Sequence, residues 1–436
     1  MSKILIKNAH ILDRSEGLDL IGDILVENGL IVGIDGMIEA EDAEVIDATG
    51  LYAAPGFIDM HVHLRDPGYT QKEDIYSGCE AAAAGGFTAV ACMPNTSPVA
   101  DSIEIINYIN NKSQNAKCRV YPVASITKEL YGIEMTDFEA LKDAGTIAFS
   151  DDGRPVESAR IMQDAMEKAN SIGSFVISHC EDMGIISNGI VNKGMISKIL
   201  NVPGMDRTSE DCVTAREIAL AGATDTRVHI AHVSTKGSVA LIMDAKRRGI
   251  RVTAETCPHY FILTEDELLK RDANYRMNPP LRTSEDRQAI LSAVANGTID
   301  CIVTDHAPHT AEDKAEFTTA PNGIIGLETS FALCNTYLVD RAVIPLQSLI
   351  YMMSTRPAQI LGVDGGHLRV GGTADIVLFD TNESWTIDAS KFKSRARNTP
   401  FDGMTVKGRV KYTILKGQIS YQDTEQPETE MEIEQF

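Results

Sequence analysis

The chain has 436 residues, with 40 Lys and Arg against 62 Asp and Glu, so its net charge is −22 at neutral pH. Its 43% hydrophobic and 23% charged residues are ordinary for a folded globular protein, which excludes disorder of the whole chain. So large an acidic excess argues against a nucleic-acid partner, because proteins that bind phosphate backbones carry basic surfaces.

The sequence predicts neither a membrane protein nor a secreted one. No run of about 18 apolar residues occurs, so we expect no transmembrane helix and no membrane partner. Lys7, Asn8 and His10 interrupt the start of the chain, which lacks the apolar core of a signal peptide. The eight cysteines are scattered without a Cys-x-x-Cys pair, which favours buried thiols in a reducing compartment. We therefore expect a cytoplasmic protein.

The two ends of the chain have short β-strand patterns separated by turns. Near the start these patterns cover residues 4–12, 23–27, 30–34 and 45–48. Similar patterns return at 374–380 and 410–420. They predict a small β-sandwich satellite domain built from both termini, residues 1–54 and 364–421. The last segment, 422–436, holds six acidic residues and no Lys or Arg, which predicts a disordered, solvated tail.

The middle of the chain alternates apolar, β-rich segments with amphipathic helical patterns. The predicted strands are 56–63, 88–93, 118–125, 146–152, 174–180, 227–233, 251–258 and 300–307. Helical patterns between them include 158–173, 209–223, 236–249 and 284–297. Eight such units close a (β/α)₈ barrel, so we predict an α/β fold with a TIM-type barrel over residues 55–363. A doubly wound open sheet is the alternative, but its first strand usually leads into a glycine-rich phosphate loop, which this chain lacks.

Histidines and aspartates stand at the carboxyl ends of five predicted strands. His61 and His63 are two residues apart, so in a strand both side chains point to one face. The others are Asp151 and Asp152, His179, His232, and Asp305. Barrels carry their catalytic groups at this end, and imidazole with carboxylate ligands suits a zinc-type ion. Core histidines and helix-capping aspartates could explain each residue alone, but not the whole set.

A series of motifs runs through nearly the whole chain, apart from the acidic tail. The motifs are DMHVHLRDPG at 59–68, MPNT at 93–96, SDDG at 150–153, HCED at 179–182, AHVS at 231–234, MNPP at 277–280, TDHAPH at 304–309, PNG at 321–323, GGTAD at 371–375 and NTPF at 398–401. Together they resemble the dihydroorotases of the class I bacterial type, which are cyclic amidohydrolases of the amidohydrolase superfamily.

The resemblance implies a metal centre of one or two Zn²⁺ ions, with two favoured. His61, His63 and Asp305 would hold one zinc, and His179 and His232 would hold the second. A carboxylate from the fourth strand would bridge the two ions, where many hydantoinases and allantoinases have a carbamoylated lysine. No lysine stands there in this chain. The residues alone leave Asp151 and Asp152 open, and the family pattern points to Asp152.

The same resemblance implies a reaction and a small-molecule substrate. The enzyme would close N-carbamoyl-L-aspartate to L-dihydroorotate plus water, reversibly, in de novo pyrimidine (UMP) biosynthesis. Asp305 would be the catalytic acid and base, because it would touch both metal and substrate. Substrate contacts would come from His63, Arg65, Asn95, Asn278, His309, Asn322 and Gly323. Of these, Arg65 would clamp the substrate carboxylate, because its planar guanidinium suits that group.

Two alternative functions stay open at this point. One is another cyclic amidohydrolase, acting on a hydantoin, dihydropyrimidine or allantoin ring. The other is a non-catalytic dihydroorotase-like partner of aspartate transcarbamoylase, although every expected metal ligand is present. The resemblance also implies a homodimer and allows association with aspartate transcarbamoylase.

Five histidines outside the ligand set are expected to have other roles. His229 faces away from His232 along its strand and should pack in the core. His259 should be either structural or placed behind the metal ligands, and His306 should lie behind the metal ligands. The loop 310–321 is long and polar, which is typical of a segment that moves over a site. His367, like His10, falls in the satellite domain.

Overall fold

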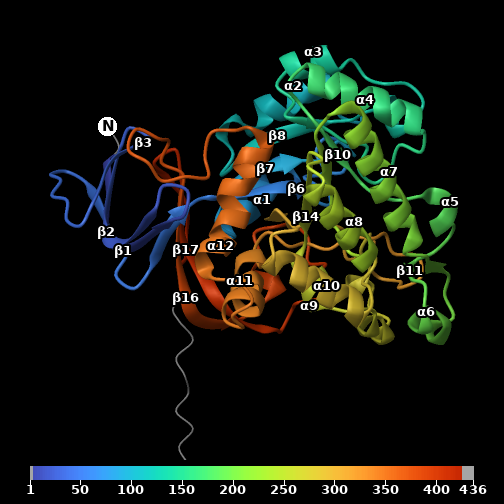
Figure 1. Ribbon diagram of the computed structural model, residues 1–436. Helices are drawn as coiled ribbons and strands as arrows, with labels where there is room; N and C mark the ends of the chain where they lie inside the picture. Colours follow the sequence, from blue (N-terminus) through green and yellow to red (C-terminus); the bar gives the residue numbers. More distant parts are fainter. Residues whose placement is uncertain (1–2, 425–436) are drawn as a thin grey trace, which may run out of the picture.

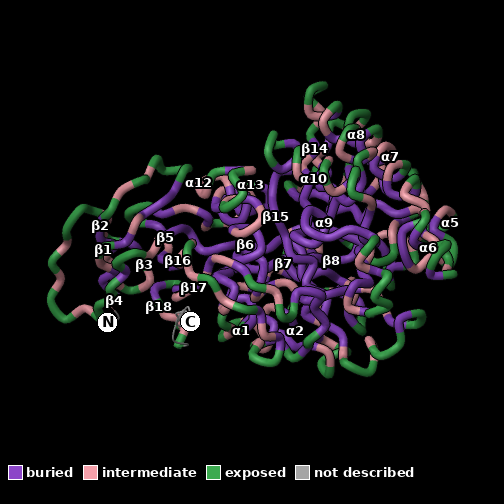
Figure 2. Tube along the Cα trace, turned by 90° about the horizontal axis from the view of Figure 1, so that it is seen from below, coloured by how far each residue is buried: buried purple, intermediate pink, exposed green. Residues whose placement is uncertain are grey.

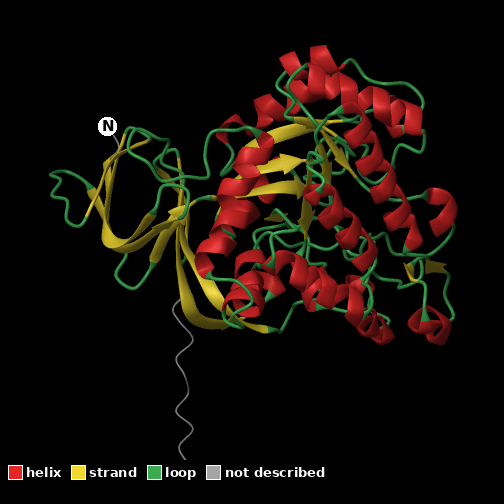
Figure 3. Cartoon of the chain, in the orientation of Figure 1, coloured by secondary structure: helices red, strands yellow, loops and turns green. Residues whose placement is uncertain are grey.

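Eight parallel strands form the barrel at the centre of the computed structural model, which describes residues 3–424 (Figures 1 and 3). They are β6 (Phe57–Val62), β7 (Phe87–Cys92), β8 (Arg119–Ala124), β9 (Ala148–Phe149), β10 (Val176–Ser178), β13 (Val228–Ile230), β14 (Val252–Thr256) and β15 (Cys301–Ile302). Each strand pairs with the next, from β6 to β15. The His63 backbone N–H donates to the His306 carbonyl at 2.8 Å, which joins the last strand segment to the first. The predicted barrel is confirmed.

Helices cover the outside of the barrel, as Figure 3 shows. The longer ones are α1 (Ile75–Ala84), α2 (Ile103–Lys112), α4 (Ala159–Ser171), α7 (Thr208–Thr224), α8 (Lys236–Arg247) and α10 (Ser284–Ala295). The shorter ones are α3 (Phe138–Asp143), α9 (Pro258–Ile262), α11 (Ser330–Cys334), α12 (Leu346–Ile350) and α13 (Arg356–Leu361). Local capping explains where they begin: the Thr235 hydroxyl accepts the Ser238 N–H at the start of α8, and Thr283 with Asp286 forms a capping box at α10.

The barrel strands are shorter than the sequence predicted, because their polar ends leave the sheet. Every residue of β6 is buried, and the barrel interior is buried throughout (Figure 2). However, β9 ends at Phe149 and β15 at Ile302, where the expected strands reached 152 and 307. Asp152 and Asp305 therefore lie on loops at the rim. Side chains there need not point alternately to the two faces of a sheet, as they do in a strand.

A small insertion that the sequence did not predict lies between β10 and α7. It contains α5 (Met183–Ile186), β11 (Val191–Asn192), α6 (Met195–Leu200) and β12 (Gly204–Met205), with the two strands paired in parallel. The strands are only two residues long, too short for a periodic pattern to show in the sequence.

The satellite domain is one mixed sheet of eight strands from both ends of the chain. Its strands are β1 (Lys3–Asp13), β2 (Leu18–Glu27), β3 (Leu30–Asp35), β4 (Glu44–Asp47), β5 (Tyr52–Pro55), β16 (Ile376–Thr386), β17 (Thr405–Leu415) and β18 (Gln418–Gln422). Side chains from opposite ends of the sheet, such as Ile31 and Ile414, share one buried core, so the sheet curves around it. This β-rich domain lies beside the barrel (Figure 1). The domain boundaries at 54/55 and 363/364 stay a prediction.

The C-terminal pattern at 410–420 is two strands rather than one. A hairpin at Lys416 and Gly417, both with positive φ, separates β17 from β18. Gln422 still belongs to β18, and Asp423 accepts from Lys411 Nζ at 2.9 Å, so the ordered chain continues past the predicted boundary at residue 421. Residues 425–436 of the predicted tail lie outside the described residues. Among residues 3–424, no helix combines the length and apolar character needed to cross a membrane.

Candidate metal centre and substrate pocket

A pocket of about 270 Å³ opens at the carboxyl ends of the barrel strands. It brings together all the predicted site residues except His61, which lies fully buried next to Asp152. The predicted residues that line it are His63, Arg65, Asn95, Asp152, His179, His232, Asn278, Asp305, His309, Asn322 and Gly323. Residues from across the chain therefore converge on one site.

His61, His63 and Asp305 form the first group of candidate ligands. The Asp305 Oδ1 atom lies 3.1 Å from His63 Nε2 and 3.7 Å from His61 Nε2. All three side chains are buried, and their ligand atoms lie within 4.8 Å of one another. Asp305 has φ 50°, a left-handed backbone that directs its side chain from the loop after β15.

Asp152 stands at the centre of the second group. Its Oδ1 atom lies 3.3 Å from both His61 Nε2 and His179 Nδ1, and 3.7 Å from His232 Nε2. Its Oδ2 atom lies 3.5 Å from His63 Nε2. One carboxylate thus faces all four histidines.

These separations fit a shared metal ion better than direct hydrogen bonds. Two ligand atoms held about 2.1 Å from one tetrahedral zinc lie roughly 3.4 Å apart, close to the distances around Asp152 and Asp305. His61 Nε2 and Asp152 Oδ1 are buried and have no hydrogen-bond partner within residues 3–424. Buried polar atoms rarely stay unpaired, so the residues present fit a metal centre.

The electrostatics of the cluster also favour a bound cation. Burial alone would lower the pKa of His61, but Asp152 and Glu255 raise it well above its usual value. Burial alone would raise the pKa of Asp152, but His61 and the other histidines hold it well below its usual value. The ionised carboxylates are therefore stabilised by positive charge placed between these side chains, and a divalent ion would supply such charge.

Asp151 and Asp152 point in different directions, and the residues alone left open which of them faces the candidate metal site. Asp151 turns away from the histidines, and its Oδ1 atom accepts the backbone N–H groups of Ile126 at 2.7 Å and Thr127 at 3.0 Å. Burial raises the pKa of Asp151 to about 6. Asp151 therefore holds the neighbouring loop, while Asp152 faces the pocket.

Three of the four histidines have their outer ring nitrogen bonded to an oxygen atom. His61 Nδ1 donates to Glu255 Oε1 at 2.7 Å, and His63 Nδ1 donates to Asn95 Oδ1 at 2.8 Å. His179 Nε2 donates to Glu181 Oε2 at 3.2 Å. Such bonds fix the tautomer and direct the other ring nitrogen toward the pocket, where His179 Nδ1 lies 2.8 Å from His232 Nε2.

The sequence interpretation missed Glu255 and Glu181. Glu255 lies in β14, and Glu181 follows His179 within the HCED motif. A glutamate inside a predicted barrel strand, 251–258, is the sequence signal that could have identified Glu255, because charged residues are rarely buried without a partner. Asn95, predicted as a substrate contact, lines the pocket and also orients His63.

Arg65 brings a positive charge to the pocket. Its Nε donates to the Pro308 carbonyl at 3.2 Å, and its Nη2 lies 3.4 Å from His309 Nε2. Within residues 3–424, no Asp or Glu forms an ion pair with it. Burial and the charge of Arg65 lower the pKa of His309 to about 3, so that imidazole is neutral.

The remaining predicted contacts surround the other side of the pocket. Asn278 Nδ2 donates to Glu181 at 3.2 Å, while its Oδ1 has no partner among the described residues. The Asn322 side chain accepts a hydrogen bond from Arg276. The backbone carbonyl of Asn322 instead lies toward the site, 2.9 Å from His309 Nε2. Gly323 has φ 132°, and a Cβ there would lie 2.7 Å from the Ala307 Cβ, so only glycine fits.

The other histidines behave largely as expected. His229 packs below the site and bonds to Glu255 at 3.0 Å, which links it to His61. His259 is fully buried, and burial lowers its pKa to about 4. His306 lies 3.4 Å from Glu73. The loop 310–321 is anchored by Lys314, whose Nζ donates to three backbone carbonyls.

Comparison with known proteins agrees with this site. Residues 50–238 match the Dihydro-orotase-like family model, and residues 208–421 match the Amidohydrolase family model. A dihydroorotase of Ruminiclostridium cellulolyticum is 47% identical over 95% of this chain and 97% of its own length. One of Geobacter metallireducens is 48% identical over 96% of this chain and 99% of its own length. The chain belongs to the dihydroorotase family.

Solved structures with the same fold include relatives of the dihydroorotases. L-hydantoinase (dihydropyrimidinase) from Arthrobacter aurescens has a TM-score of 0.86 at 26% identity, and the match covers 96% of each chain. A dihydropyrimidinase from Brevibacillus agri NCHU1002 has a TM-score of 0.84 at 27% identity, covering 96% of this chain and 94% of that one. The barrel with its β-rich domain is thus shared across these amidohydrolases.

Proposed function

We propose that the chain is a zinc-dependent dihydroorotase that interconverts N-carbamoyl-L-aspartate and L-dihydroorotate in pyrimidine biosynthesis. The observation that carries this proposal is the composition of one pocket. A cluster of histidines and carboxylates that fits a metal centre shares it with Arg65, a cation that forms no ion pair with a carboxylate of the described chain. A substrate with both a hydrolysable ring amide and a carboxylate matches the two features.

His61, His63 and Asp305 would hold one zinc, and His179 and His232 the other, with Asp152 shared between them. The spacing of these side chains and the unpaired atoms of His61 and Asp152 support two ions over one. Zinc, when bound, activates water as a nucleophile near neutral pH and polarises a carbonyl group.

Asp305 is the proposed catalytic residue. Burial alone would raise its pKa, but the nearby His63 and His61 hold it below its usual value, so the carboxylate is ionised and can accept a proton. In hydrolysis it takes the proton of the attacking nucleophile and passes it to the departing ring nitrogen, and in ring closure the transfers run backwards. Asp305 lies on a rim loop after β15, where its Oδ1 atom is close to His63 and its side chain lines the pocket.

Arg65 is proposed to bind the substrate carboxylate, with Asn95 and His309 beside it. A neutral His309 adds no second positive charge and offers no repulsion to Arg65. Asn278, whose Oδ1 is unpaired, and the backbone at Asn322 and Gly323 are proposed to contact the ring. A hydrogen bond to a charged group contributes about 1.5–3 kcal/mol, which makes this clamp a main source of substrate affinity.

The likeness of the fold to hydantoinases makes a related cyclic amidohydrolase the competing function. A carboxylate in place of a lysine at the end of the fourth strand, together with the Arg65 clamp, favours a dihydroorotate ring. A homodimer, association with aspartate transcarbamoylase, a cytoplasmic location and the domain division 55–363 stay predictions.

The test is an assay of the purified protein with dihydroorotate, a hydantoin, dihydrouracil and allantoin, with metal content measured on the same sample. We expect turnover of dihydroorotate alone, its loss after treatment with a chelator, and its recovery with Zn²⁺. Turnover of hydantoin without dihydroorotate would replace the proposal by the competing function. Absence of turnover in a zinc-loaded sample would favour the non-catalytic partner.

A further inference from the structure

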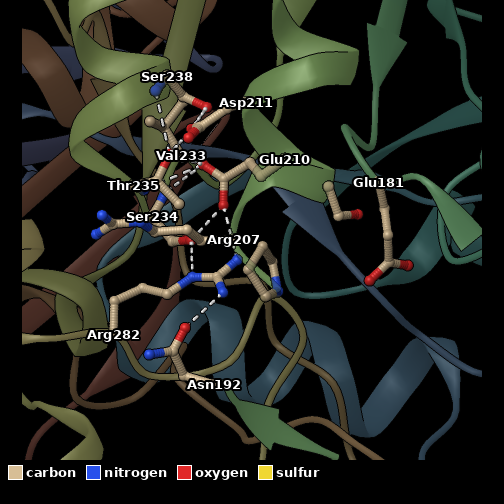
Figure 4. Close-up of polar contacts among 12 residues, drawn as sticks. Glu181, Asn192, Arg207, Glu210, Asp211, Val233, Ser234, Thr235, Ser238 and Arg282 are labelled. Atoms are coloured by element: carbon tan, nitrogen blue, oxygen red, sulfur yellow. Dashed lines mark hydrogen bonds and ion pairs between the residues drawn. The ribbon is translucent and has the colours of Figure 1, made fainter. Parts of the chain in front are cut away.

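A buried arginine outside the pocket, Arg282, joins three segments of the chain, one of which directly follows the candidate ligand His232 (Figure 4). Its Nε donates to Ser234 Oγ at 3.1 Å, its Nη1 to Asn192 Oδ1 at 2.9 Å, and its Nη2 to Glu210 Oε2 at 3.3 Å. Each nitrogen of the guanidinium therefore contacts a different segment. Only 6% of the residue is exposed, so these contacts are shielded from solvent.

Glu210 holds the loop that directly follows His232. Its Oε1 atom accepts the backbone N–H groups of Ser234 at 2.9 Å and Thr235 at 3.1 Å. Its Oε2 atom accepts the Ser234 hydroxyl as well as Arg282 (Figure 4). His232 itself has φ 30°, a backbone conformation that non-glycine residues adopt only where the surroundings impose it. The Glu210 carboxylate is one of those surroundings.

Arg282 is also tied to the segment that carries Asn278. Arg282 lies four positions after Asn278 in the chain, and the Arg282 carbonyl accepts the Glu265 N–H at 2.8 Å. Glu265 in turn accepts from Asn192 Nδ2 at 2.5 Å. In the same segment the Pro279 carbonyl accepts the Tyr260 hydroxyl at 2.6 Å. One chain of contacts from the His232 loop to the Asn278 segment thus passes through the Arg282 guanidinium, in addition to the contacts of His179 with His232 at 2.8 Å and with Asn278 at 3.5 Å.

Neither a gain in stability nor contact with the substrate explains why Glu210 and Arg282 form a buried ion pair. Arg282 and Glu210 do not line the pocket, so they do not touch the substrate. A buried ion pair contributes little net stability, because the desolvation of both charges offsets their attraction. What such a pair does supply is a defined geometry between the segments that it joins.

We propose that Glu210 and Arg282 are positioning residues that hold the metal ligand His232 and the substrate contact Asn278 at a set distance. The pair couples metal binding to substrate binding without touching either ligand. This inference rests on the proposed function, because it takes His232 as a zinc ligand and Asn278 as a substrate contact.

The experiment compares Arg282→Lys and Ser234→Ala with the unmodified protein. Lysine keeps the charge opposite Glu210, but its compact ammonium cannot reproduce the planar fork in which three separate guanidinium nitrogens each contact one acceptor. Ser234→Ala removes one hydroxyl, which accepts from Arg282 and donates to Glu210, and leaves the ion pair. The matched control is Arg356→Lys. Arg356 contacts Asp300 at 2.7 and 3.2 Å before the start of β15, the end of the barrel away from the pocket.

Three measurements are made on each variant: the thermal midpoint, the affinity of the metal-free protein for Zn²⁺, and kcat and KM for dihydroorotate. We expect Arg282→Lys to weaken zinc binding and raise KM, each by about tenfold, which is the low end of effects at groups supporting a metal ligand. Ser234→Ala should change both in the same direction by a smaller factor. Arg356→Lys should lower the thermal midpoint and leave both values unchanged.

The result that overturns the inference is a zinc affinity and KM within twofold of the unmodified protein in both Arg282→Lys and Ser234→Ala. If Arg282→Lys does not fold, Ser234→Ala decides the matter. Failure of the proposed function would be visible separately, as absent dihydroorotate turnover in the unmodified protein. The comparison of zinc affinities would still test the link to His232.

Discussion

Replacing Asp305 by Asn removes a charge and a proton acceptor while keeping the size of the side chain. The carboxylate lies 3.1 Å from His63 Nε2 and 3.7 Å from His61 Nε2, and both histidines keep their partners on the outer ring nitrogen. Asp152 also stays in place near both histidines. We therefore expect Asp305→Asn to retain bound metal, because three other side chains still surround that position.

The expected loss of activity follows from the role of Asp305 in proton transfer. A positioned acid or base contributes about 10²–10⁴-fold to a rate. At 1.36 kcal/mol for each factor of ten, this is about 3 to 5 kcal/mol of activation free energy. The loss should fall on kcat, because Arg65 and the rest of the clamp are unchanged, and KM should stay within a few-fold.

The assay measures dihydroorotate hydrolysis at saturating substrate and the zinc content of the same sample. Asp23→Asn is the matched control, since Asp23 is also buried and accepts two backbone N–H groups, from Asn8 at 2.9 Å and Ile38 at 2.8 Å, in the satellite domain. Asp23→Asn should lower stability but not kcat. A kcat for Asp305→Asn within twofold of the unmodified protein would refute the proton-transfer role. Loss of metal in proportion to activity would show that Asp305 acts as a ligand alone.

Three further predictions follow from the pocket and its surroundings. Arg65→Ala should raise KM for dihydroorotate by about 10- to 100-fold through the lost charged hydrogen bonds, with a smaller effect on kcat, and an unchanged KM would remove Arg65 from the clamp. Glu255→Gln should weaken zinc binding by about 10- to 100-fold, measured by titration of the metal-free protein, because His61 loses its charged partner, and an unchanged affinity would contradict that role. Burial raises the pKa of Glu328 from 4.5 to about 7, so the folded state binds its proton more tightly than the unfolded state does. The free energy of unfolding should therefore fall as pH rises from 4.5 to 7, and Glu328→Gln should reduce that slope in denaturant titrations, whereas an unchanged slope would assign the effect to other groups.

Local patterns predicted the barrel and most candidate ligands because both depend on short-range features. Buried strands show as apolar segments, and a polar residue directly after such a segment lies at the rim, where His179 and His232 are found. The spacing of His61 and His63 places them on one face, and their rings lie 5.5 Å apart. The helical pattern predicted from residue 284 matches the start of α10, where Thr283 and Asp286 form a local capping box.

The elements that the sequence did not predict have weak local signals. The insertion with β11 and β12 has strands of two residues, and β5 is four residues long. The sequence predicts one strand pattern over 410–420 and no hairpin at Gly417, because the residues on both sides of the turn are apolar and β-rich. In each case tertiary pairing, not local preference, defines the element.

The order of amino acids specifies the chemistry available to this protein: which imidazoles, carboxylates and cations stand at the ends of barrel strands. Which of these atoms meet depends on the folded arrangement of the chain. Asp151 and Asp152 are neighbours of one type, yet one bonds to the loop at Thr127 and the other faces four histidines. Glu255 reaches His61 across 194 positions of the chain. Such contacts depend on closure of the barrel, which brings distant strand ends to one rim, and local periodicity contains no information about that closure.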